Sequence, residues 1–412
     1  MARINQSALF ISYDGLLDPL GASQILPYLR GIAQHRDYLH IVSFEKTARF
    51  AQGAQALKAQ LNALGIGWTP LIFTTRYGKW GKLWDLLRMY LSCLLLQGRY
   101  QFAIVHCRSY QAMQVGHLLK QLTGARTIFD MRGLWVDERV EGGLWQRHYW
   151  LDALLYTYYK RIERRLLAGA SHIVVLTERV AALLPELSPR LGAGVTVIPC
   201  CADFEHFVPA SAAQRLQVRQ QLTLPADGLV LCYLGSLGTW YLLEPMLRLF
   251  ASAVEQRADV HLLIITKDWG AAYEAQLVAL NLSAWRSHIH IHPASREQVP
   301  CFLGAADIML SFIKPSYSKI ASSPTKLAEA LAMGLPVICN AGVGDVDSIV
   351  QTLQAGVIVD SACCDFSQLV TRLDAIKAMG GYELRQRARQ ACGLEVAAQR
   401  YHEVYQTLSE AR

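Results

Sequence analysis

The stretch that decides the fold is SSPTKLAEALAMGLPVICN, residues 322–340. Its first half predicts a helix, because Ser323 is a favoured N-cap and Pro324 then occupies the first helical position. Two leucines four residues apart share one face of this helix, and Gly334 ends it with a left-handed residue. A buried strand, PVICN, follows, and another, IMLSF at 308–312, precedes it. The stretch is therefore a strand-helix-strand unit of a parallel sheet.

The same alternation of short apolar runs and helix-period segments extends along the whole chain. In the first half the runs are ALFISY (8–13), LHIVSF (39–44), FAIVHC (102–107), RTIFDM (126–131), HIVVLT (172–177) and VTVIP (195–199). In the second half they are LVLCYLGS (229–236), HLLIIT (261–266), IHIH (289–292), IMLSF (308–312), PVICN (336–340) and GVIVD (356–360). Nearly continuous hydrophobic strands that alternate with helices predict two doubly wound α/β domains.

The periodicity is lost around PCCADFEHFVPASAAQ, residues 199–214. We therefore predict an N-terminal domain over 1–205 and a C-terminal domain over 206–393, with the last helix, 394–412, packing back on the first domain. Because ligands bind outside the carboxyl ends of the strands in open parallel sheets, two such domains are expected to face a central cleft.

Composition excludes several classes of protein. Of the 412 residues, 52% are hydrophobic and 18% charged, which excludes a disordered chain. The sequence contains no window of 18 uninterrupted apolar residues, so we expect no membrane-spanning helix. The N-terminal apolar run is too short for a secretory signal, and we therefore expect a cytoplasmic protein. The adjacent pairs Cys200-Cys201 and Cys363-Cys364 match neither metal nor disulfide spacing, and all ten cysteines are interpreted as small buried hydrophobes.

The net charge of +7 is unevenly placed. Residues 1–205 contain 23 Lys and Arg against 15 Asp and Glu, whereas residues 206–412 contain 17 against 18. This asymmetry indicates an anionic partner for the first half, or else a basic surface that only favours solubility. Nucleic acid is not the expected partner, because the basic half contains no recognisable nucleic-acid-binding module.

The helix in 322–340 offers chemistry at its N-terminus. Its free N–H groups and positive dipole end suit a diphosphate, and Lys326 adds a point charge there. Glu329 lies further in, where a carboxylate accepts hydrogen bonds from the two vicinal hydroxyls of a ribose. The alternative is a plain helix with Glu329 in solvent.

The run PTKLAEALAMGLPVI (324–338) resembles the nucleotide-sugar-binding segment of retaining GT-B glycosyltransferases of the family-4 type, the glycosyl transferases group 1. Three further features agree with that family in order and spacing. VTVIPCCADFEHFVP (195–209) resembles its interdomain linker, LVLCYLGSLG (229–238) its first donor-domain strand and loop, and DGLLDPLGASQILPYLRGIA (14–33) its N-terminal glycine loop.

The resemblance implies a GT-B fold and transfer of a sugar, of the hexosyl type and with retention, from a nucleoside-diphosphate sugar. It implies a glycan or lipid-linked acceptor, a role in cell-surface polysaccharide or glycolipid synthesis, and neither a cofactor nor an obligatory metal. The alternatives are a nucleotide-sugar-binding protein without transferase activity and a GT-B epimerase or hydrolase.

The chain also departs from the family pattern. Of the family's two glutamates eight residues apart, only the second is present, as Glu329, and the first falls at Ala321. The loop GSLGTWYLLEPM (235–246) lacks the Arg and Lys that usually follow its Gly-Ser. Other residues must therefore bind the donor, and we predict this set: Gly21, Ser236, Lys267, Ser322, Ser323, Thr325, Lys326 and Glu329.

Positive and acidic side chains at the ends of first-domain strands are the candidate catalytic residues, namely Arg108, Asp130, Arg132 and Asp137. Arginine suits phosphate because its planar fork donates two parallel hydrogen bonds. Arg132 has the alternative of a structural ion pair with Asp130, Asp137 or Glu138, and Gly21 that of an ordinary turn. His106, on the same strand face as Arg108, is either functional or a core histidine.

The segment RYGKWGKLWDLLRMYLSCLLLQGRY (76–100) repeats Trp and Leu at helical spacing and carries five basic residues. Such a helix lies on anionic lipid, in which case the protein contacts the inner face of the plasma membrane peripherally. A core-facing crossover helix explains the leucines equally well. The basic cluster KRIERR (160–165) belongs to the same domain.

Overall fold

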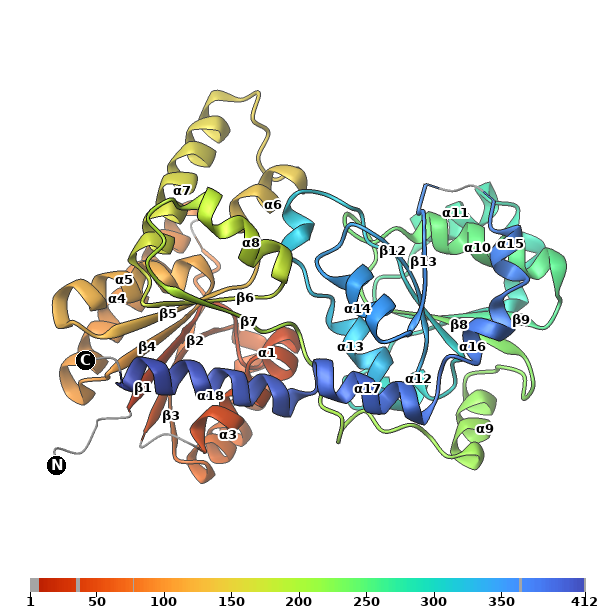
Figure 1. Cartoon of the computed structure of the whole chain (residues 1–412), viewed down its shortest axis with the longest axis horizontal. Helices are drawn as coiled ribbons and strands as arrows, with labels where there is room; N and C mark the ends of the chain where they lie inside the picture. The colour runs from red at the N-terminus through yellow and green to blue at the C-terminus, as the bar shows by residue number, and fades with distance from the viewer. Residues whose placement is uncertain (1–6, 35–37, 77, 363–364, 411–412) are drawn as a thin grey trace. The chain divides into compact units, whose positions relative to one another are not determined.

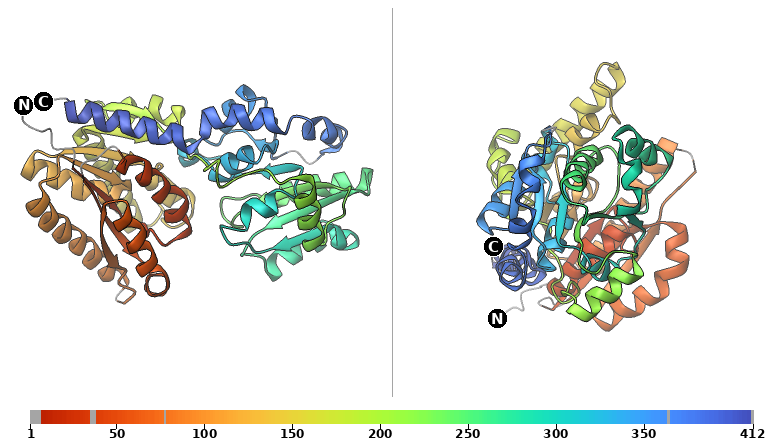
Figure 2. Two further views of the ribbon diagram at one scale, coloured as in Figure 1. Left: turned by 90° about the horizontal axis from the view of Figure 1, so that it is seen from below. Right: turned by 90° about the vertical axis from the view of Figure 1, so that its right-hand side faces the viewer.

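The computed structural model describes residues 7–34, 38–76, 78–362 and 365–410. The chain forms two compact units, residues 1–199 together with 394–412, and residues 200–393. Each unit is a parallel α/β sheet with helices on both faces (Figures 1 and 2), which confirms the predicted pair of Rossmann-like domains.

The first unit contains a seven-stranded parallel sheet in the order β3-β2-β1-β4-β5-β6-β7. Its strands are β1 (Ala8–Ser12), β2 (Leu39–Glu45), β3 (Ile66–Ile72), β4 (Ile104–Arg108), β5 (Arg126–Met131), β6 (His172–Val175) and β7 (Gly194–Val197). Every residue of β1, β2 and β4 is buried, as expected for strands covered on both faces.

The helices of the first unit connect these strands, and the last one returns from the C-terminus of the chain. They are α1 (Pro19–Gln24), α2 (Leu26–Ala33), α3 (Thr47–Ala63), α4 (Gly78–Tyr100), α5 (Ser109–Thr123), α6 (Trp135–Glu141), α7 (Trp150–Gly169), α8 (Glu178–Leu187) and α18 (Leu394–Glu410). The helix α18 packs mainly against α2 and also touches β4.

The second unit contains a six-stranded parallel sheet in the order β10-β9-β8-β11-β12-β13. Its strands are β8 (Leu229–Leu234), β9 (Val260–Ile265), β10 (Ile289–His292), β11 (Ile308–Ser311), β12 (Val337–Asn340) and β13 (Gly356–Val359). The order reverses beside β8, and in open sheets such a switch point is where ligands bind, at the carboxyl ends of the strands.

Helices and short 3-10 turns connect the strands of the second unit. They are α9 (Ala212–Gln221), α10 (Leu243–Gln256), α11 (Ala271–Ala279), η1 (Leu282–His288), α12 (Val299–Leu303), η2 (Ser318–Ala321), α13 (Thr325–Ala332), α14 (Val346–Thr352), α15 (Ser367–Val370), α16 (Leu373–Lys377) and α17 (Tyr382–Cys392). The helices α10, α15 and α16 bury their apolar sides with alternate residues of β8 and β9 in one core.

The boundary between the units falls after Pro199, earlier than the predicted position after residue 205. The linker beyond Pro199 packs within the second unit, where Ala202 pairs with Gly393 and Arg385 donates to the carbonyl oxygens of Phe204 and Phe207. The segment that lacks strand and helix periodicity is therefore a connection between the units, and it packs against the second unit.

Most of the described cysteines are buried, as predicted, but Cys301 on α12 is exposed, so that interpretation was wrong there. Cys363 and Cys364 lie outside the described residues. No helix in the described part of the chain is long and apolar enough to cross a membrane.

Asp307, just before β11, carries a buried ionic network in the second unit. Its Oδ2 accepts from Arg219 Nη2 and from the Val230 amide, each at 2.8 Å. Its Oδ1 lies 2.8 Å from Arg215 Nη2 and 2.9 Å from Lys377 Nζ. The carboxylate thus joins α9 and α16 to the start of two central strands.

We predict that Asp307→Ala lowers the free energy of unfolding of the second unit by about 3–5 kcal/mol, because it leaves Arg219 buried without its carboxylate. The matched control is Asp374→Ala, which removes an exposed ion pair with Arg257 and is expected to cost less than about 1 kcal/mol. Urea unfolding followed by circular dichroism measures both variants. Equal losses in the two would contradict this role of Asp307.

Candidate functional site

The N-terminus of α13 lies at the carboxyl edge of the second sheet, after β11 and η2. The helix begins at Thr325 with Pro324 as its N-cap, so the predicted cap at Ser323 and first helical position at Pro324 were wrong by one residue. The reason is that Ser323 is engaged elsewhere, since its Oγ accepts from the Cys200 amide at 3.0 Å. Gly334 follows the helix at φ 70°, as predicted for its end.

Lys326, in the first turn of α13, is buried against two aromatic rings. Its Nζ lies 3.0 Å from the Tyr233 hydroxyl, 4.2 Å from the centroid of the Tyr233 ring and 4.0 Å from that of Tyr241. Burial lowers the pKa of Lys326 to about 7, although the charge of Glu329 favours the protonated form. Within the described residues Lys326 forms no ion pair within 4 Å, so an anion placed there would meet a cation without a close partner.

Gly235 has the backbone conformation that this arrangement needs. Its φ is 123°, and an added Cβ would lie 2.9 Å from Lys326 Nζ. A residue with a side chain would therefore both strain the backbone and displace the ammonium group.

Glu329 lies one turn further along α13 and is partly buried. Burial raises the pKa of its carboxyl, while the charges of Arg296 and Lys326 oppose that rise. Among the described residues no side chain or backbone group hydrogen-bonds to the carboxylate. Arg296, in the loop after β10, is a neighbour that sequence reasoning missed, because nothing in its local sequence points toward α13.

A second lysine lies against the loop that follows β8. Lys319 of η2 is buried with its Nζ 3.9 Å from the centroid of the Trp240 ring. The aromatic pair Trp240-Tyr241 thus faces two lysines, Lys319 and Lys326. The sequence shows that this loop has no Lys or Arg of its own. It did not lead us to predict that the loop packs against lysines from other segments, although two adjacent aromatic residues are a signal for such contacts.

The other predicted donor residues lie along the same carboxyl edge. The backbone carbonyl of Ser236 accepts from the Tyr233 hydroxyl, and the next amide, that of Leu237, donates to Asp268 at 3.1 Å. Lys267, after β9, is exposed, and Ser322 and Thr325 are partly buried beside the start of α13. The structure therefore collects all the predicted donor residues of the second unit at one edge of its sheet.

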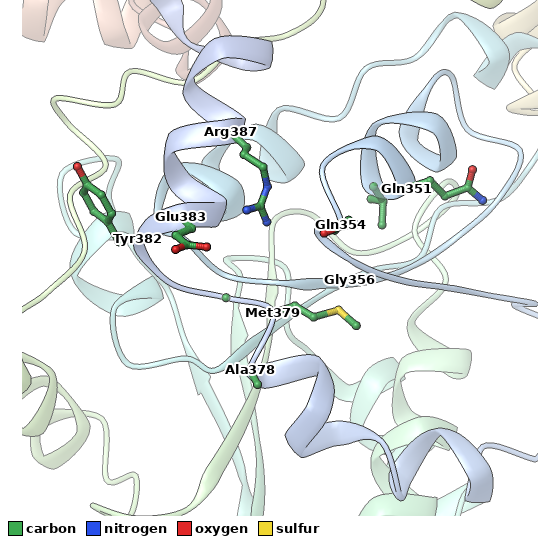
Figure 3. A pocket seen from close by; sticks show the side chains of 10 residues that line it. Gln351, Gln354, Gly356, Ala378, Met379, Tyr382, Glu383 and Arg387 are labelled. Carbon is green, nitrogen blue, oxygen red and sulfur yellow. The ribbon is translucent and has the colours of Figure 1, made fainter.

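Two pockets lie at opposite edges of the second unit. One, of about 610 Å³, is lined by the loop after β8, including Tyr241, together with Tyr273 and Ser361, and lies at the carboxyl edge. The other, of about 690 Å³, includes Gly356, the first residue of β13, and so lies at the amino edge (Figure 3). Glu383 and Arg387 line this larger pocket, which contains no predicted site residue.

In the first unit, Asp130 at the end of β5 is the centre of a buried charge cluster. Its oxygens lie 3.5 Å from Arg132 Nη1 and 3.8 Å from Arg108 Nη1, and Tyr401 of α18 donates to Oδ2 at 3.2 Å. Burial alone would raise the pKa of Asp130, but Arg132, His106 and Arg108 together lower it. The strand register explains the meeting, because Arg108 pairs with Asp130 across β4 and β5.

This cluster places two guanidinium groups on one buried carboxylate. Asp14, which is partly buried, adds a second carboxylate 3.5 Å from Arg108 Nε. The alternative of a structural ion pair for Arg132 is thus observed with Asp130, and the two guanidinium groups are matched by two carboxylates at the carboxyl edge of the sheet.

His106 is a fully buried residue of this cluster. Its Nδ1 lies 2.9 Å from the Tyr405 hydroxyl, and its Nε2 lies 3.6 Å from Asp130. Burial lowers the pKa of His106, although the nearby Asp130 opposes this shift. These contacts favour the core interpretation, and Tyr401 and Tyr405 are partners on α18 that sequence reasoning missed.

Asp137 belongs to a different network. Its carboxylate accepts from the Tyr156 hydroxyl at 2.8 Å and from Lys160 at 3.0 Å. Lys160 also contacts the buried Glu163, which accepts from Tyr110 at 2.7 Å. The carboxylate that was predicted to be catalytic is therefore used to fasten α7 to α5 and α6.

Gly21 on α1 is buried against the preceding loop. An added Cβ would lie 2.0 Å from the Gly15 carbonyl oxygen and 2.6 Å from the Leu16 Cα. Glu45, missed by sequence reasoning, holds this loop by accepting from the amides of Leu16 at 2.8 Å and Leu17 at 3.1 Å. Close packing of the backbone therefore explains why a glycine is needed at position 21. This agrees with the alternative interpretation, in which Gly21 belongs to an ordinary turn.

Within the described residues no group of three His, Cys, Asp or Glu side chains is arranged to hold a metal ion.

Comparison with known proteins identifies relatives of both units. The family described as glycosyl transferases group 1 matches residues 214–392, and the glycosyl transferase 4-like domain matches residues 30–201. A putative teichuronic acid biosynthesis glycosyltransferase, TuaC of Bacillus subtilis, is 25% identical over 227 residues, which are 54% of this chain and 53% of that protein. The D-inositol 3-phosphate glycosyltransferase of Thermomonospora curvata is 28% identical over 225 residues, 51% of this chain and 50% of that protein.

The chain therefore spans about half the length of the curated relatives it matches. A solved structure of Anabaena Alr3699/HepE, in complex with UDP and glucose, has the same fold with a TM-score of 0.68. The two proteins are 15% identical, and the superposition covers 98% of this chain and all of that one.

We predict that Asp130→Asn lowers the free energy of unfolding of the first unit by about 3 kcal/mol at pH 7, because Arg108 and Arg132 lose the charge between them. The lowered pKa means that the carboxylate stabilises the fold above its ordinary pKa of about 4 and that this contribution is lost as the pH falls further. The difference in the free energy of unfolding between Asp130→Asn and the wild type should therefore become smaller between pH 4 and pH 2. Tyr401→Phe, which removes one hydrogen bond, should cost only about 1 kcal/mol. Urea titrations of both variants at each pH provide the measurement, and a difference independent of pH would contradict the charge cluster.

Proposed function

Because the chain belongs to the glycosyl transferases group 1 and has their GT-B fold, we propose that it is a retaining hexosyltransferase acting on a nucleoside-diphosphate sugar. The acceptor in this proposal is a glycan or a lipid-linked glycan, and the product enters cell-surface polysaccharide or glycolipid. The chain works in the cytoplasm, at the inner face of the plasma membrane.

The observation that carries the proposal is Lys326. Its ammonium group is buried at the N-terminus of α13 and has no ion-pair partner among the described residues. A site that binds an anion is expected to have this feature. The first turn of α13 adds the positive end of the helix dipole, and Lys319 adds a second charge on the same aromatic loop. UDP in the Anabaena structure supports a nucleoside diphosphate as that anion.

In this site the diphosphate of the donor takes the N-terminus of α13, and Glu329 accepts from the ribose hydroxyls. The bond between the anomeric carbon and the phosphate oxygen breaks while the bond to the acceptor oxygen forms on the same face. The acceptor proton passes to the departing phosphate oxygen. The protein then contributes orientation and positive charge at the leaving group, which are the largest effects available without covalent catalysis.

Within the first unit, Arg108 and Arg132 stay our candidate catalytic residues, and Asp130 orients them. Asp137 does not enter this scheme, because Lys160 and Tyr156 already occupy its oxygens. No step needs a metal ion, because the lysines and the helix dipole supply the charge.

One observation favours a second candidate function, a nucleotide-sugar-binding protein without transfer. Ala321, buried at the end of η2, occupies the position of the missing first glutamate, so the donor sugar lacks one carboxylate. Slow hydrolysis of the donor in the absence of acceptor separates the two functions, because a pure binding protein leaves the donor intact.

We predict that a nucleoside diphosphate at about 100 times its Kd stabilises the wild type by ~2.7 kcal/mol and that Glu329→Ala abolishes most of this shift. Thermal melting with UDP, GDP, CMP and their sugars measures it and identifies the base. The matched control is Glu383→Ala in the amino-edge pocket, which should keep the full shift. A full shift in Glu329→Ala would remove this residue from the site.

We further predict that donor affinity falls as the pH rises above 7. The pKa of Lys326 is lowered to about 7, so the free protein loses the ammonium charge that a diphosphate needs, and binding weakens by up to about tenfold per pH unit between pH 7 and 9. Calorimetric titration with a UDP-sugar, whose phosphates keep their charge in this range, gives the profile. Lys326→Gln should bind weakly at every pH, and a wild-type profile as flat as that of this variant would contradict the assignment.

A further inference from the structure

Helix α4 presents its apolar side to the outside of the first unit. Its outward residues include two tryptophans and four leucines that are 46% to 76% exposed, namely Trp80, Leu83, Trp84, Leu87, Leu91 and Leu95. Its inward face, by contrast, repeats every four residues through Gly81, Asp85, Met89, Cys93 and Gln97. The core-facing interpretation of these leucines is therefore wrong.

The inward side of α4 is held partly by polar contacts. Asp85 accepts from the Thr74 hydroxyl at 2.6 Å and from its amide at 3.0 Å. Gln97 donates to the Phe102 carbonyl at 3.1 Å. These bonds fix the rotation of the helix, so the apolar stripe is a permanent feature of the surface and cannot be hidden by a small roll of α4.

Helix α7 adds a second exposed apolar stripe beside the first. Its residues Trp150, Leu151, Leu154 and Tyr158 are 53% to 72% exposed. Both helices pack against α5 (Figure 1), and the phenol of Tyr158 on α7 is close enough to Tyr90 on α4 to contribute to its raised pKa. The two stripes therefore form one surface, which we call the α4-α7 face. Contiguous exposed apolar surface of this kind marks an interaction site.

The charges around the α4-α7 face have one sign. Every charged side chain that the structure describes as exposed on these two helices is basic: Lys82, Arg99, Arg161, Arg164 and Arg165. Of the acidic residues of the two helices, Asp85 and Glu163 are buried, and Asp152 is partly buried and accepts from the Gln146 amide. Arg161 and Arg165 continue the face of Leu154 and Tyr158 along α7, because they follow at helical spacing.

We propose that the α4-α7 face docks on an anionic lipid bilayer, with its tryptophans in the headgroup region and its arginines and lysines on acidic headgroups. Tryptophan and leucine beside basic residues are the composition of interfacial helices. A second copy of the chain fits less well, since a two-fold contact would bring two faces of the same positive charge together. This docking adds to the proposed function the surface that meets a lipid-linked acceptor, and it is measured without any sugar transfer.

The test is sedimentation of the full chain with vesicles of phosphatidylcholine, with and without 30% phosphatidylglycerol. We expect binding to the anionic vesicles only and at least a tenfold loss for Trp80→Ser combined with Trp84→Ser. Arg161→Gln with Arg165→Gln should also weaken binding and should reduce its dependence on salt. The matched control is Leu216→Ser with Val278→Ser, which removes exposed apolar residues of the second unit and should bind as the wild type does.

Circular dichroism and the nucleotide-induced melting shift should be unchanged in the tryptophan variant, which separates a failure of docking from a failure of folding or of the donor site. Equal binding to neutral vesicles, or equal binding by the tryptophan variant, overturns the proposal. So does a wild type that is dimeric without lipid and becomes monomeric in the tryptophan variant, because the occupant of the face is then a second copy.

Discussion

The candidate donor site of the second unit is built around one buried lysine at the N-terminus of α13. Lys326 is held over Tyr233 and Tyr241 in place of a carboxylate, and its pKa falls to about 7 because burial disfavours the charged form. The aromatic faces stabilise the ammonium group only partly, since such contacts contribute about 0.5–2 kcal/mol. An anionic ligand would restore the missing charge. The positive φ of Gly235 goes with this constraint, because an added Cβ there would lie 2.9 Å from Lys326 Nζ.

The first unit also buries positive charge, but there the charge is paired with a carboxylate. There the guanidinium groups of Arg108 and Arg132 lie around one buried carboxylate, Asp130, and α18 completes the cluster through Tyr401 and Tyr405. The C-terminal helix is thus part of the candidate site of a unit that begins almost four hundred residues earlier. A residue such as Tyr401 acts through Asp130, so it is a positioning residue rather than a catalytic one.

The two units also differ in their outer surfaces. Alternate residues of β8 and β9 and the apolar side of α10 are covered, as amphipathic elements of a soluble domain normally are. Helix α4 does the reverse, because Asp85 and Gln97 are bonded inward and the tryptophans point outward. The apolar periodicity of 76–100 is the same in either orientation, so only the contacts of the inward side could decide between core and surface.

The sequence by itself determined the two parallel α/β domains, because two series of nearly continuous hydrophobic strands alternate with helices, and it predicted the donor-side residues at one sheet edge. It also led to the prediction that the stretch 322–340 is the centre of the donor site. Only the tertiary structure decided which side chains meet across long separations: Lys319 and Lys326 on the Trp240-Tyr241 loop, Glu45 on the loop before Gly21, and Tyr401 on Asp130. It also showed that Asp137 is bonded to Lys160 and Tyr156. Periodicity reports which face of an element is apolar, whereas the partner of a buried charge is set by the packing of distant segments, which leaves no local signal in the chain.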